Sequence, residues 1–355
     1  EHIPLTRSAD GQPVAQFTFQ TIEKIGLLKL DVLGLSNLRT IQHTLRMVQQ
    51  KSGHKLMPED IALDDDDAFA LLRKGRTVGV FQLESTGMTR TLRDLAPANI
   101  GELAAIIALY RPGPMANIET NIDRKHGRSD PAYLHESLEP ILHETYGVLV
   151  YADQVLMIAR ELPGYSWDEA DNFRKAIGKK IRHAVQKEHE QFVTRSTERG
   201  IPTDVAEQVF TLIEPFAGYG FNKAHAVSYA VIAYWTAWLK AHYPVEFLSA
   251  LLATDAGEIE KIARTKTEAE LLGVEVLPPN INQSGVTFEP RDRSIVFGLA
   301  AVKNVGEPAV EAIVAARESG GSFTSLADAC ERVDLRSTPK SAWEALIKVG
   351  ALDEL

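Results

Sequence analysis

The sequence has very little cysteine and no long apolar run. Its single cysteine, Cys330, allows no internal disulfide and cannot build a thiolate metal site alone. The lack of cystines is typical of a reducing compartment, so we expect a cytoplasmic protein. No stretch approaches the ~20 apolar residues of a membrane span, and no apolar signal segment opens the chain. We therefore expect no membrane association.

The composition is that of a globular protein. The 355 residues are 45% hydrophobic and 24% charged, which excludes a disordered or collagen-like chain and suggests two or three domains. The net charge of −10 argues weakly against a nucleic-acid partner, although a local basic groove can lie on an acidic molecule. Because the first residue is Glu1 rather than Met, we expect a piece of a longer chain.

Hydrophobic periodicity predicts a mostly helical protein with a few short strands. A change of composition near residue 275 predicts a domain boundary there. Helices are expected at 37–51, 101–110, 153–162, from 167, at 204–213, after 222 and over 245–272; strands are expected at 24–35, 77–83, 146–151, 274–280 and 294–298. The four aspartates of 64–67 could bind a metal, but we favour a helix start, because carboxylates stabilise the positive end of a helix.

Three segments carry basic or phosphate-binding character. Residues 173–187 contain six Lys or Arg and no acid, and on one helix Lys175, Lys179 and Arg182 share a face. We favour phosphate binding over a solvated face for this stretch. In 216–225, a Gly-rich turn, an N-cap candidate at Asn222 and the pair Lys223 and His225 suit a phosphate site, or equally an ordinary capped helix.

The third segment, 302–309, holds a Val-x-x-Val-Gly hairpin with Ala309 and Ile313 behind it. Its turn N–H groups could face DNA phosphates. Taken alone it is more often a plain connecting turn. Asp31 and Lys29 lie two residues apart on the predicted strand, and such a pair is usually a surface ion pair. The other face of that strand is apolar and a glycine follows, which would instead hold Asp31 at the edge of a cleft.

Taken together, the motifs resemble a known family. They occur in the order of the catalytic alpha subunits of bacterial DNA polymerase III, the family C replicative polymerases, and the resemblance covers essentially the whole chain. The motifs are Lys29-Leu30-Asp31-Val32-Leu33-Gly34-Leu35, Val80-Phe81-Gln82-Leu83-Glu84-Ser85, Arg111-Pro112-Gly113-Pro114, Thr145-Tyr146-Gly147, Gly218-Tyr219-Gly220-Phe221-Asn222-Lys223-Ala224-His225 and Leu239-Lys240-Ala241-His242-Tyr243-Pro244.

The resemblance implies an α+β, mostly α-helical layout. Residues 1–35 would be the C-terminal part of a palm, 36–275 the fingers, and 276–355 a helix-hairpin-helix module that grips duplex DNA. Asp31 would be one of three catalytic aspartates that hold two Mg²⁺ ions, with Lys29 beside it. Nucleotide binding would fall to Arg111, Arg174, Lys175, Lys179, Lys223 and His225, and DNA binding to Lys303, Asn304 and Gly306.

The sequence departs from the family in three places. Lys175 stands where an arginine is common, and Ala224 and Ala226 stand where serine is frequent. No Pro-Asp-Gly-Ser-Asp segment, which carries the other two catalytic aspartates, is present. We therefore expect a fragment of a DNA-directed DNA polymerase that is inactive alone, because one carboxylate cannot hold two Mg²⁺ ions.

The expected partners are primer-template DNA and deoxynucleoside triphosphates. The resemblance also implies a sliding clamp, a clamp loader and a proofreading exonuclease subunit, contacted mostly through parts outside this chain. The expected location is the replisome at the bacterial nucleoid. The alternative is a non-enzymatic helix-hairpin-helix scaffold of DNA repair or recombination, which has no need of a triphosphate site on the basic helix.

Overall fold

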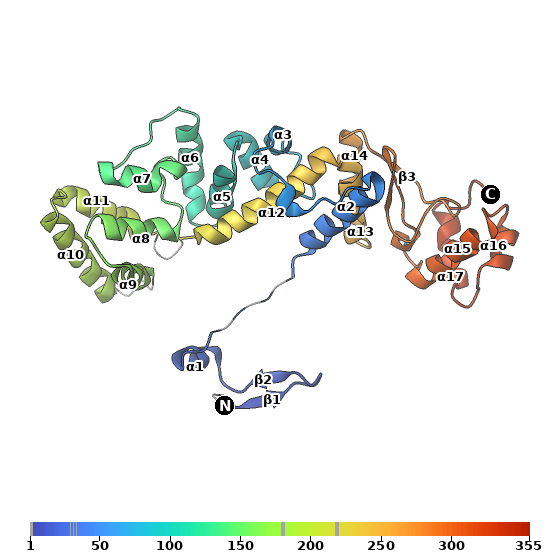
Figure 1. The fold of residues 1–355 in the computed structure, drawn as a ribbon, viewed down its shortest axis with the longest axis horizontal. Coiled ribbons are helices and arrows are strands. Elements are labelled where there is room, and N and C mark those ends of the chain that lie inside the picture. The colour runs from blue at the N-terminus through green and yellow to red at the C-terminus, as the bar shows by residue number, and fades with distance from the viewer. Residues whose placement is uncertain (1–2, 29, 31, 33, 179–181, 217–219) are drawn as a thin grey trace. The chain divides into compact units, whose positions relative to one another are not determined.

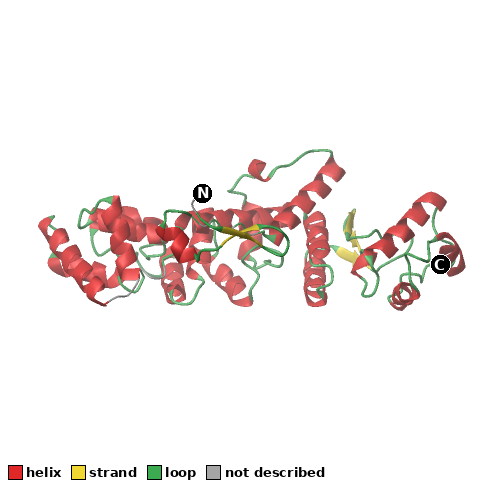
Figure 2. Ribbon diagram, turned by 90° about the horizontal axis from the view of Figure 1, so that it is seen from below, coloured by secondary structure: helices red, strands yellow, loops and turns green. Residues whose placement is uncertain are grey.

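The computed structural model describes residues 3–28, 30, 32, 34–178, 182–216 and 220–355. It is mostly helical with a few short strands, which confirms the predicted α+β class (Figures 1 and 2). The chain divides into two compact units, Glu1–Ser36 and Asn37–Leu355. Within the described part, no helix combines the length and the apolar character needed to cross a bilayer.

The first unit contains a two-stranded antiparallel sheet and one short helix. Strand β1 (Leu5–Arg7) pairs with β2 (Pro13–Ala15), and α1 (Phe19–Lys24) follows. The strand predicted at 24–35 is wrong for the residues that are described there, which form no ladder. The alternating side chains Leu28, Leu30 and Val32 are instead 83–94% exposed. A strand needs a hydrogen-bonded partner, and β1 and β2 pair with each other.

The second unit begins with four helices; the sequence predicts those near 37–51 and 101–110 and the start of the one at the aspartate run. They are α2 (Ser36–Ser52), α3 (Asp66–Arg73), α4 (Thr86–Leu95) and α5 (Ile100–Leu109), with a 3₁₀ turn at Pro58–Asp60. Asp65 caps α3, because its Oδ1 accepts the N–H of Ala68 at 2.8 Å. The aspartate run is therefore a helix start, as predicted.

The strand predicted at 77–83 is wrong. Gly79 and Gln82 have φ angles of +77° and +63°, which bend the backbone into successive turns. The turn lies against α12 (Lys223–His242), whose side chains bind its polar groups. Thr236 Oγ1 accepts the N–H of Phe81 at 3.1 Å, and Lys240 Nζ donates to the carbonyls of Arg76 and Val78. These side chains replace the ladder that a strand would need.

A second group of helices surrounds its own apolar cluster. The elements are 3₁₀ turns at Pro114–Asn117, Glu136–Leu138 and His143–Thr145, and helices α6 (Ile118–Lys125), α7 (Glu139–Leu142), α8 (Ala152–Glu161), α9 (Trp167–Gly178), α10 (Arg182–Glu198) and α11 (Thr203–Ile213). Phe173 lies at the centre, with its ring 5.4 Å from that of Phe192 and 6.1 Å from that of Phe210.

The segment 146–151 is buried but is not the predicted strand. Val148 and Val150 belong to the apolar cluster around α5 and α12, whereas Leu149 belongs to the cluster around α8 and α11. The alternating side chains of this segment therefore pack into two different apolar clusters. In the described residues its ladder pairing is a single bridge between Tyr151 and Phe221.

Helix α12 is the long buried helix of this unit. It packs on α3 and α5, and α13 (Pro244–Thr254) and α14 (Ile259–Leu271) follow it (Figure 1). Its start after Asn222 and its end before Pro244 confirm the sequence prediction.

The C-terminal elements form a small sheet and a helical module. Strands β3 (Glu275–Leu277), β4 (Glu289–Arg291) and β5 (Ser294–Val296) have the order β3-β5-β4, with β5 parallel to β3 and antiparallel to β4. A 3₁₀ turn at Leu299–Ala301 and helices α15 (Glu307–Gly320), α16 (Leu326–Arg332) and α17 (Lys340–Lys348) follow.

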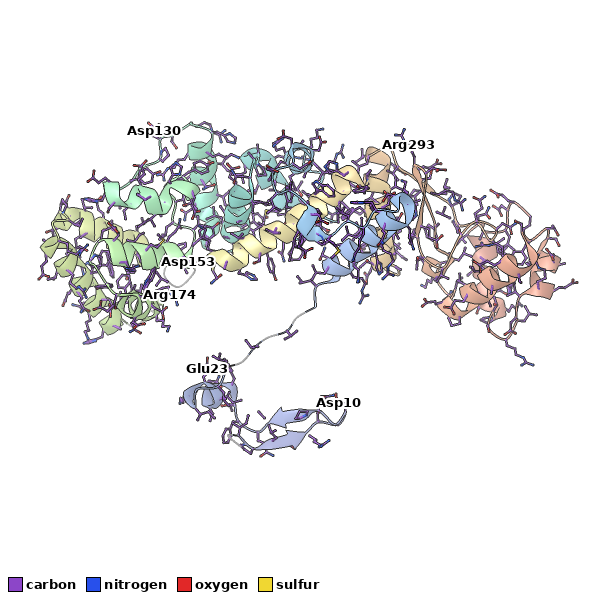
Figure 3. All side chains as sticks on the ribbon, in the orientation of Figure 1. Asp10, Glu23, Asp130, Asp153, Arg174 and Arg293 are labelled. Atoms are coloured by element: carbon purple, nitrogen blue, oxygen red, sulfur yellow. The ribbon has the colours of Figure 1, made fainter. Side chains whose placement is uncertain are left out.

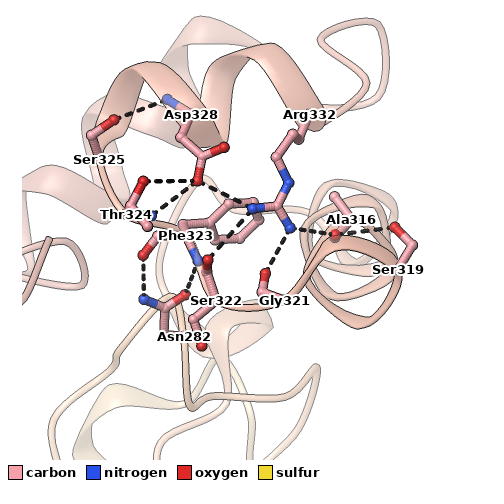
Figure 4. Close-up of polar contacts among 10 residues, drawn as sticks. All are labelled: Asn282, Ala316, Ser319, Gly321, Ser322, Phe323, Thr324, Ser325, Asp328 and Arg332. Atoms are coloured by element: carbon pink, nitrogen blue, oxygen red, sulfur yellow. Dashed lines mark hydrogen bonds and ion pairs between the residues drawn. The ribbon is translucent and has the colours of Figure 1, made fainter.

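Arg332 holds the loop between α15 and α16 (Figure 4). Its guanidinium donates to the carbonyls of Ala316 and Gly321 at 2.8 and 2.6 Å, and lies 4.6 Å from the ring centre of Phe323. Asn282 clamps Phe323 from the other side through both main-chain groups. The loop is therefore hydrogen-bonded to the segment between β3 and β4.

Candidate functional site

The first turn of α12 gathers several of the predicted site residues. Asn222 Oδ1 accepts the N–H of His225 at 2.8 Å, which confirms its role as the N-cap. The N–H of Lys223 donates to Asp153 Oδ2 at 3.0 Å. The main-chain N–H groups of Lys223 and His225 are therefore both occupied within the protein. The carboxylate of Asp153 already occupies the positive end of the helix.

The side chain of Lys223 also has an acidic partner. Its Nζ lies 2.7 Å from both carboxylate oxygens of Glu144, and 5.8 Å from the ring centre of Tyr151. Both members of the ion pair are more than 40% exposed, so water screens their attraction. An incoming anion can therefore compete with Glu144 for Lys223.

A row of rings in edge-on and tilted contact begins at this helix start. The Arg111 guanidinium lies 4.1 Å from the ring centre of Phe221. The His225 ring lies 5.2 Å from that of Phe221 and 4.1 Å from that of Tyr229. Tyr229 in turn lies 5.0 Å from Phe81. This row brings together the turn after α5, the loop before α12, α12 itself and the 77–83 turn.

Arg111 is positioned by a turn that follows α5. Pro112 and Pro114 flank Gly113, whose φ of +97° bends the chain just before the 3₁₀ turn at Pro114–Asn117. Arg111 Nε donates to the carbonyl of Ala108 at 2.9 Å, which points the guanidinium across the end of α5. Burial lowers the pKa of Arg111 from its ordinary value, but the group stays charged.

The structure describes helix α9 as far as Gly178 and α10 from Arg182 onward. Lys179 lies outside the described residues, as do positions 180 and 181. The predicted face of Lys175, Lys179 and Arg182 on one helix therefore stays a prediction.

Arg174 and Lys175 bind a common carboxylate. Arg174 Nη2 and Lys175 Nζ lie 2.8 and 2.6 Å from the two oxygens of Asp171. Hydrogen bonds from Lys175 and then Arg174 lower the pKa of Asp171. Helix α9 packs on α8, which carries the Asp153 that binds Lys223 (Figure 3).

Lys29 and Asp31 lie outside the described residues, so the structure does not place these two predicted catalytic side chains. Among the described residues, no group of three or more His, Cys, Asp or Glu is arranged to hold a metal ion.

The hairpin of the C-terminal module has the geometry of a surface turn on a core. Val302 and Val305 are buried, whereas Lys303, Asn304 and Gly306 are exposed. Asn304 has a φ of +70°, a left-handed conformation that asparagine tolerates better than most residues. The element before the hairpin is a 3₁₀ turn rather than the expected α-helix, and α15 follows. Ala309 and Ile313 are buried behind the hairpin, as predicted.

Sequence reasoning missed four contributors to this site: Phe81, Tyr229, Glu144 and Asp153. Tyr229 lies one helical turn after His225, so helix periodicity could have found it. Glu144 and Lys223 are 79 positions apart in the sequence, so no local sequence pattern could have predicted their contact.

Comparison with known proteins agrees with these features. Residues 37–200 match the finger domain of the bacterial DNA polymerase III alpha subunit, and residues 273–355 match a helix-hairpin-helix motif. By sequence, the chain is a homologue of one segment of bacterial DNA polymerase III alpha subunits. The predicted resemblance is thereby confirmed.

The relatives are similar over nearly all of this chain. DNA polymerase III subunit alpha of Thermus aquaticus is 46% identical over 356 residues, which cover 99% of this chain and 29% of the relative. Those of Chlamydia trachomatis and Bacillus subtilis are 43% and 42% identical, again over 99% of this chain, with 28% and 32% of the relative covered. The chain thus spans less than a third of the length of these polymerase subunits.

Proposed function

We propose that the chain is the fingers and duplex-binding part of a DNA-directed DNA polymerase. The parent reaction would be template-directed transfer of a deoxynucleotidyl group to a primer 3′-hydroxyl at the replicating bacterial chromosome. The observation that carries the proposal is the convergence of Arg111, Phe221 and His225 with Lys223 at the start of α12. Cations and an aromatic face at a helix start suit a triphosphate and its base.

The proposed domains are 1–35 as the end of a palm, 36–275 as fingers and 276–355 as a helix-hairpin-helix module. The unit boundary at Ser36 and the two family matches support this division. The alternative of a repair scaffold is not favoured, because the finger-domain match and the relatives' similarity extend far beyond the hairpin module.

In the proposed nucleotide site, Lys223, Arg111 and His225 bind at the start of α12, while Arg174, Lys175 and Lys179 face the triphosphate from α9 and the residues after it. Their positive charges would complement the negative charge that builds on the leaving pyrophosphate. In the proposed DNA site, Lys303, Asn304 and Gly306 contact the duplex backbone through the exposed hairpin.

Mg²⁺ belongs to the proposed reaction but does not fit the described residues of this chain. Asp31, with Lys29 beside it, is the residue of this chain that the family pattern assigns to the metal site. Two Mg²⁺ ions need several oxygen ligands in octahedral geometry, and one carboxylate does not supply them. We therefore derive no metal-dependent step for this chain. The clamp, clamp loader and exonuclease subunit remain proposed partners of the parent protein.

The test is protection of lysines from acetylation, followed by mass spectrometry of the intact 355-residue chain. A deoxynucleoside triphosphate should protect Lys223 and Lys175, because its phosphates displace Glu144 and Asp171 from them. Lys266, exposed on α14, is the control that should react equally with and without nucleotide. Equal reactivity of Lys223 in both samples would overturn the proposed nucleotide site.

A further inference from the structure

Helix α2 and the segment after it form an unusually basic stretch. Residues 36–57 contain Arg39, Arg46, Lys51 and Lys55 and not one Asp or Glu, in a chain of net charge −10. Lys51 is neutralised by Glu246, whose Oε1 lies 2.6 Å from its Nζ. Within the described part of the chain, the other three cations have no acidic partner. Uncompensated cations on an acidic protein indicate an anionic ligand.

The three free cations surround one hollow. Its volume is 670 Å³, and Arg39 and Arg46 line it from α2, Lys55 from the following segment and Trp235 from α12. Seven positions separate the two arginines, which places them on the same face of α2, about 10 Å apart along its axis. Gln42 and Gln49 add amide groups between and beyond them.

We propose that this hollow binds a single strand of DNA. The inference rests on the proposed function in one respect, that DNA is the substrate of this chain. A groove that follows a phosphate backbone with cations and offers an aromatic ring to the bases is the usual design of single-strand sites. Here Arg39, Arg46 and Lys55 supply the cations, and the half-buried indole of Trp235 supplies the ring. A duplex, whose bases are already stacked, would leave the indole unused.

A second hollow limits the path of the strand. It has a volume of 620 Å³, shares Arg46 with the first, and is also lined by Glu289 and Asp292. Those two carboxylates repel phosphate, so the strand lies on the Lys55 side of α2 rather than on the β4 side. Burial, and then the positive charges of Arg46 and Arg39, lower the pKa of His43. His43 is therefore neutral near pH 7, and the arginines supply the attraction.

The experiment measures binding of a fluorescent 12-nucleotide oligothymidylate to the intact chain. Excess unlabelled hairpin duplex is present, so that the duplex site is occupied. The variant is Arg39→Gln with Arg46→Gln, and the control is Lys74→Gln with Lys266→Gln, which removes two exposed charges elsewhere. We expect the arginine variant to bind roughly 10-fold more weakly near 0.1 M salt. The slope of log affinity against log salt should fall by about 1.4, or ~0.7 per phosphate contact. The control should change neither quantity.

A second readout locates the strand. An oligonucleotide carrying iodouracil, irradiated on the intact chain, should crosslink within residues 38–58 or at Trp235. Unchanged single-strand affinity in the arginine variant, or crosslinks confined to 276–355, would overturn this inference. In that outcome the proposed function survives if nucleotide still protects Lys223 and duplex still binds. An arginine variant that loses duplex and single-strand binding equally would show a general phosphate surface, and would also overturn the single-strand site.

Discussion

Lys223 Nζ contacts both carboxylate oxygens of Glu144 at 2.7 Å, from a residue 79 positions earlier in the chain. This contact places a carboxylate on a lysine proposed to bind triphosphate. Nucleotide binding must therefore displace Glu144. Since the pair is exposed, its net contribution to stability is about 0–1 kcal/mol.

The first prediction follows from that competition. Glu144→Gln should bind deoxynucleoside triphosphate up to about fivefold more tightly, because Lys223 no longer leaves an ion pair. Isothermal titration of the intact chain measures the affinity. Asp130→Asn, which removes a charge from the loop after α6, controls for net charge (Figure 3). Weaker binding by the glutamine variant would show that Glu144 orients Lys223 rather than competing for it.

The second prediction concerns the buried cation of α12. Lys240 Nζ donates to the carbonyls of Arg76 and Val78 at 2.8 and 2.7 Å and to Glu268 Oε1 at 2.8 Å. Lys240→Met should lower the free energy of unfolding by up to ~3–5 kcal/mol, because it leaves the buried Glu268 with Arg76 Nη1, 4.0 Å away, in place of a direct ion pair. Urea titration measures this change. The double variant with Glu268→Leu should recover much of the loss, and a loss below about 1 kcal/mol in the single variant would contradict the prediction.

The third prediction is a pH dependence of the same group. Burial lowers the pKa of Lys240 to about 8 from 10.5. Between these pH values the unfolded chain binds more protons than the folded chain, so stability rises with pH. The stability of wild type relative to Lys240→Met should therefore increase by up to about 3 kcal/mol between pH 8 and 10.5. Urea titrations of both proteins at pH 7.5 and 10 measure the difference. A difference that shrinks at pH 10 would show that the charged form is the stabilising one.

The fourth prediction concerns the contact between α12 and the start of α3. The hydroxyl of Tyr234 accepts the N–H of Asp65 at 2.8 Å and donates to the carbonyl of Ala62 at 2.9 Å. Tyr234→Phe leaves both main-chain groups without this partner and should cost ~1–3 kcal/mol of stability. Tyr229→Phe keeps the ring that contacts Phe81 and His225, and should change stability by less than about 0.5 kcal/mol. Thermal unfolding monitored by circular dichroism compares them, and equal losses would refute the assigned role of the hydroxyl.

The fifth prediction separates fold from DNA contact in the hairpin. A Cβ at Gly306 would meet no atom closer than 3.7 Å, so the fold does not require glycine there. Gly306→Ala should keep the unfolding free energy within about 0.5 kcal/mol. It should nevertheless weaken duplex binding several-fold, because the methyl group obstructs approach of a phosphate to the main chain. Fluorescence anisotropy with a labelled duplex measures the affinity; unchanged binding would remove Gly306 from the DNA site.

The sequence predicts helices better than it predicts the extended segments. Residues 148–150 alternate as a strand does, but their alternation serves two cores. Periodicity reports which side chains are buried, and it does not report which backbone supplies the hydrogen bonds. At 77–83 those bonds come from Thr236 and Lys240, more than 150 positions away, which no local pattern can reveal.

The site was predictable to the extent that its signals are local. The cap at Asn222 depends on a neighbouring residue, and it was predicted correctly. The occupied N–H of Lys223 was not, because Asp153 reaches it from another helix. The predicted face with Lys179 stays a prediction, because residues 179–181 lie outside the described part of the chain.

The packing of α12 determines which parts of the chain unfold together. Its residues contribute to the cluster that contains α3 and α5, and also to the cluster that contains α13 and β5; Trp235 and Trp238 pack against both. These two clusters cannot melt one without the other. The clusters around Phe173 and around Trp343 do not draw on α12. Partial unfolding should thus release residues 138–216 or residues 281–351 first, while amide hydrogens along α12 exchange last.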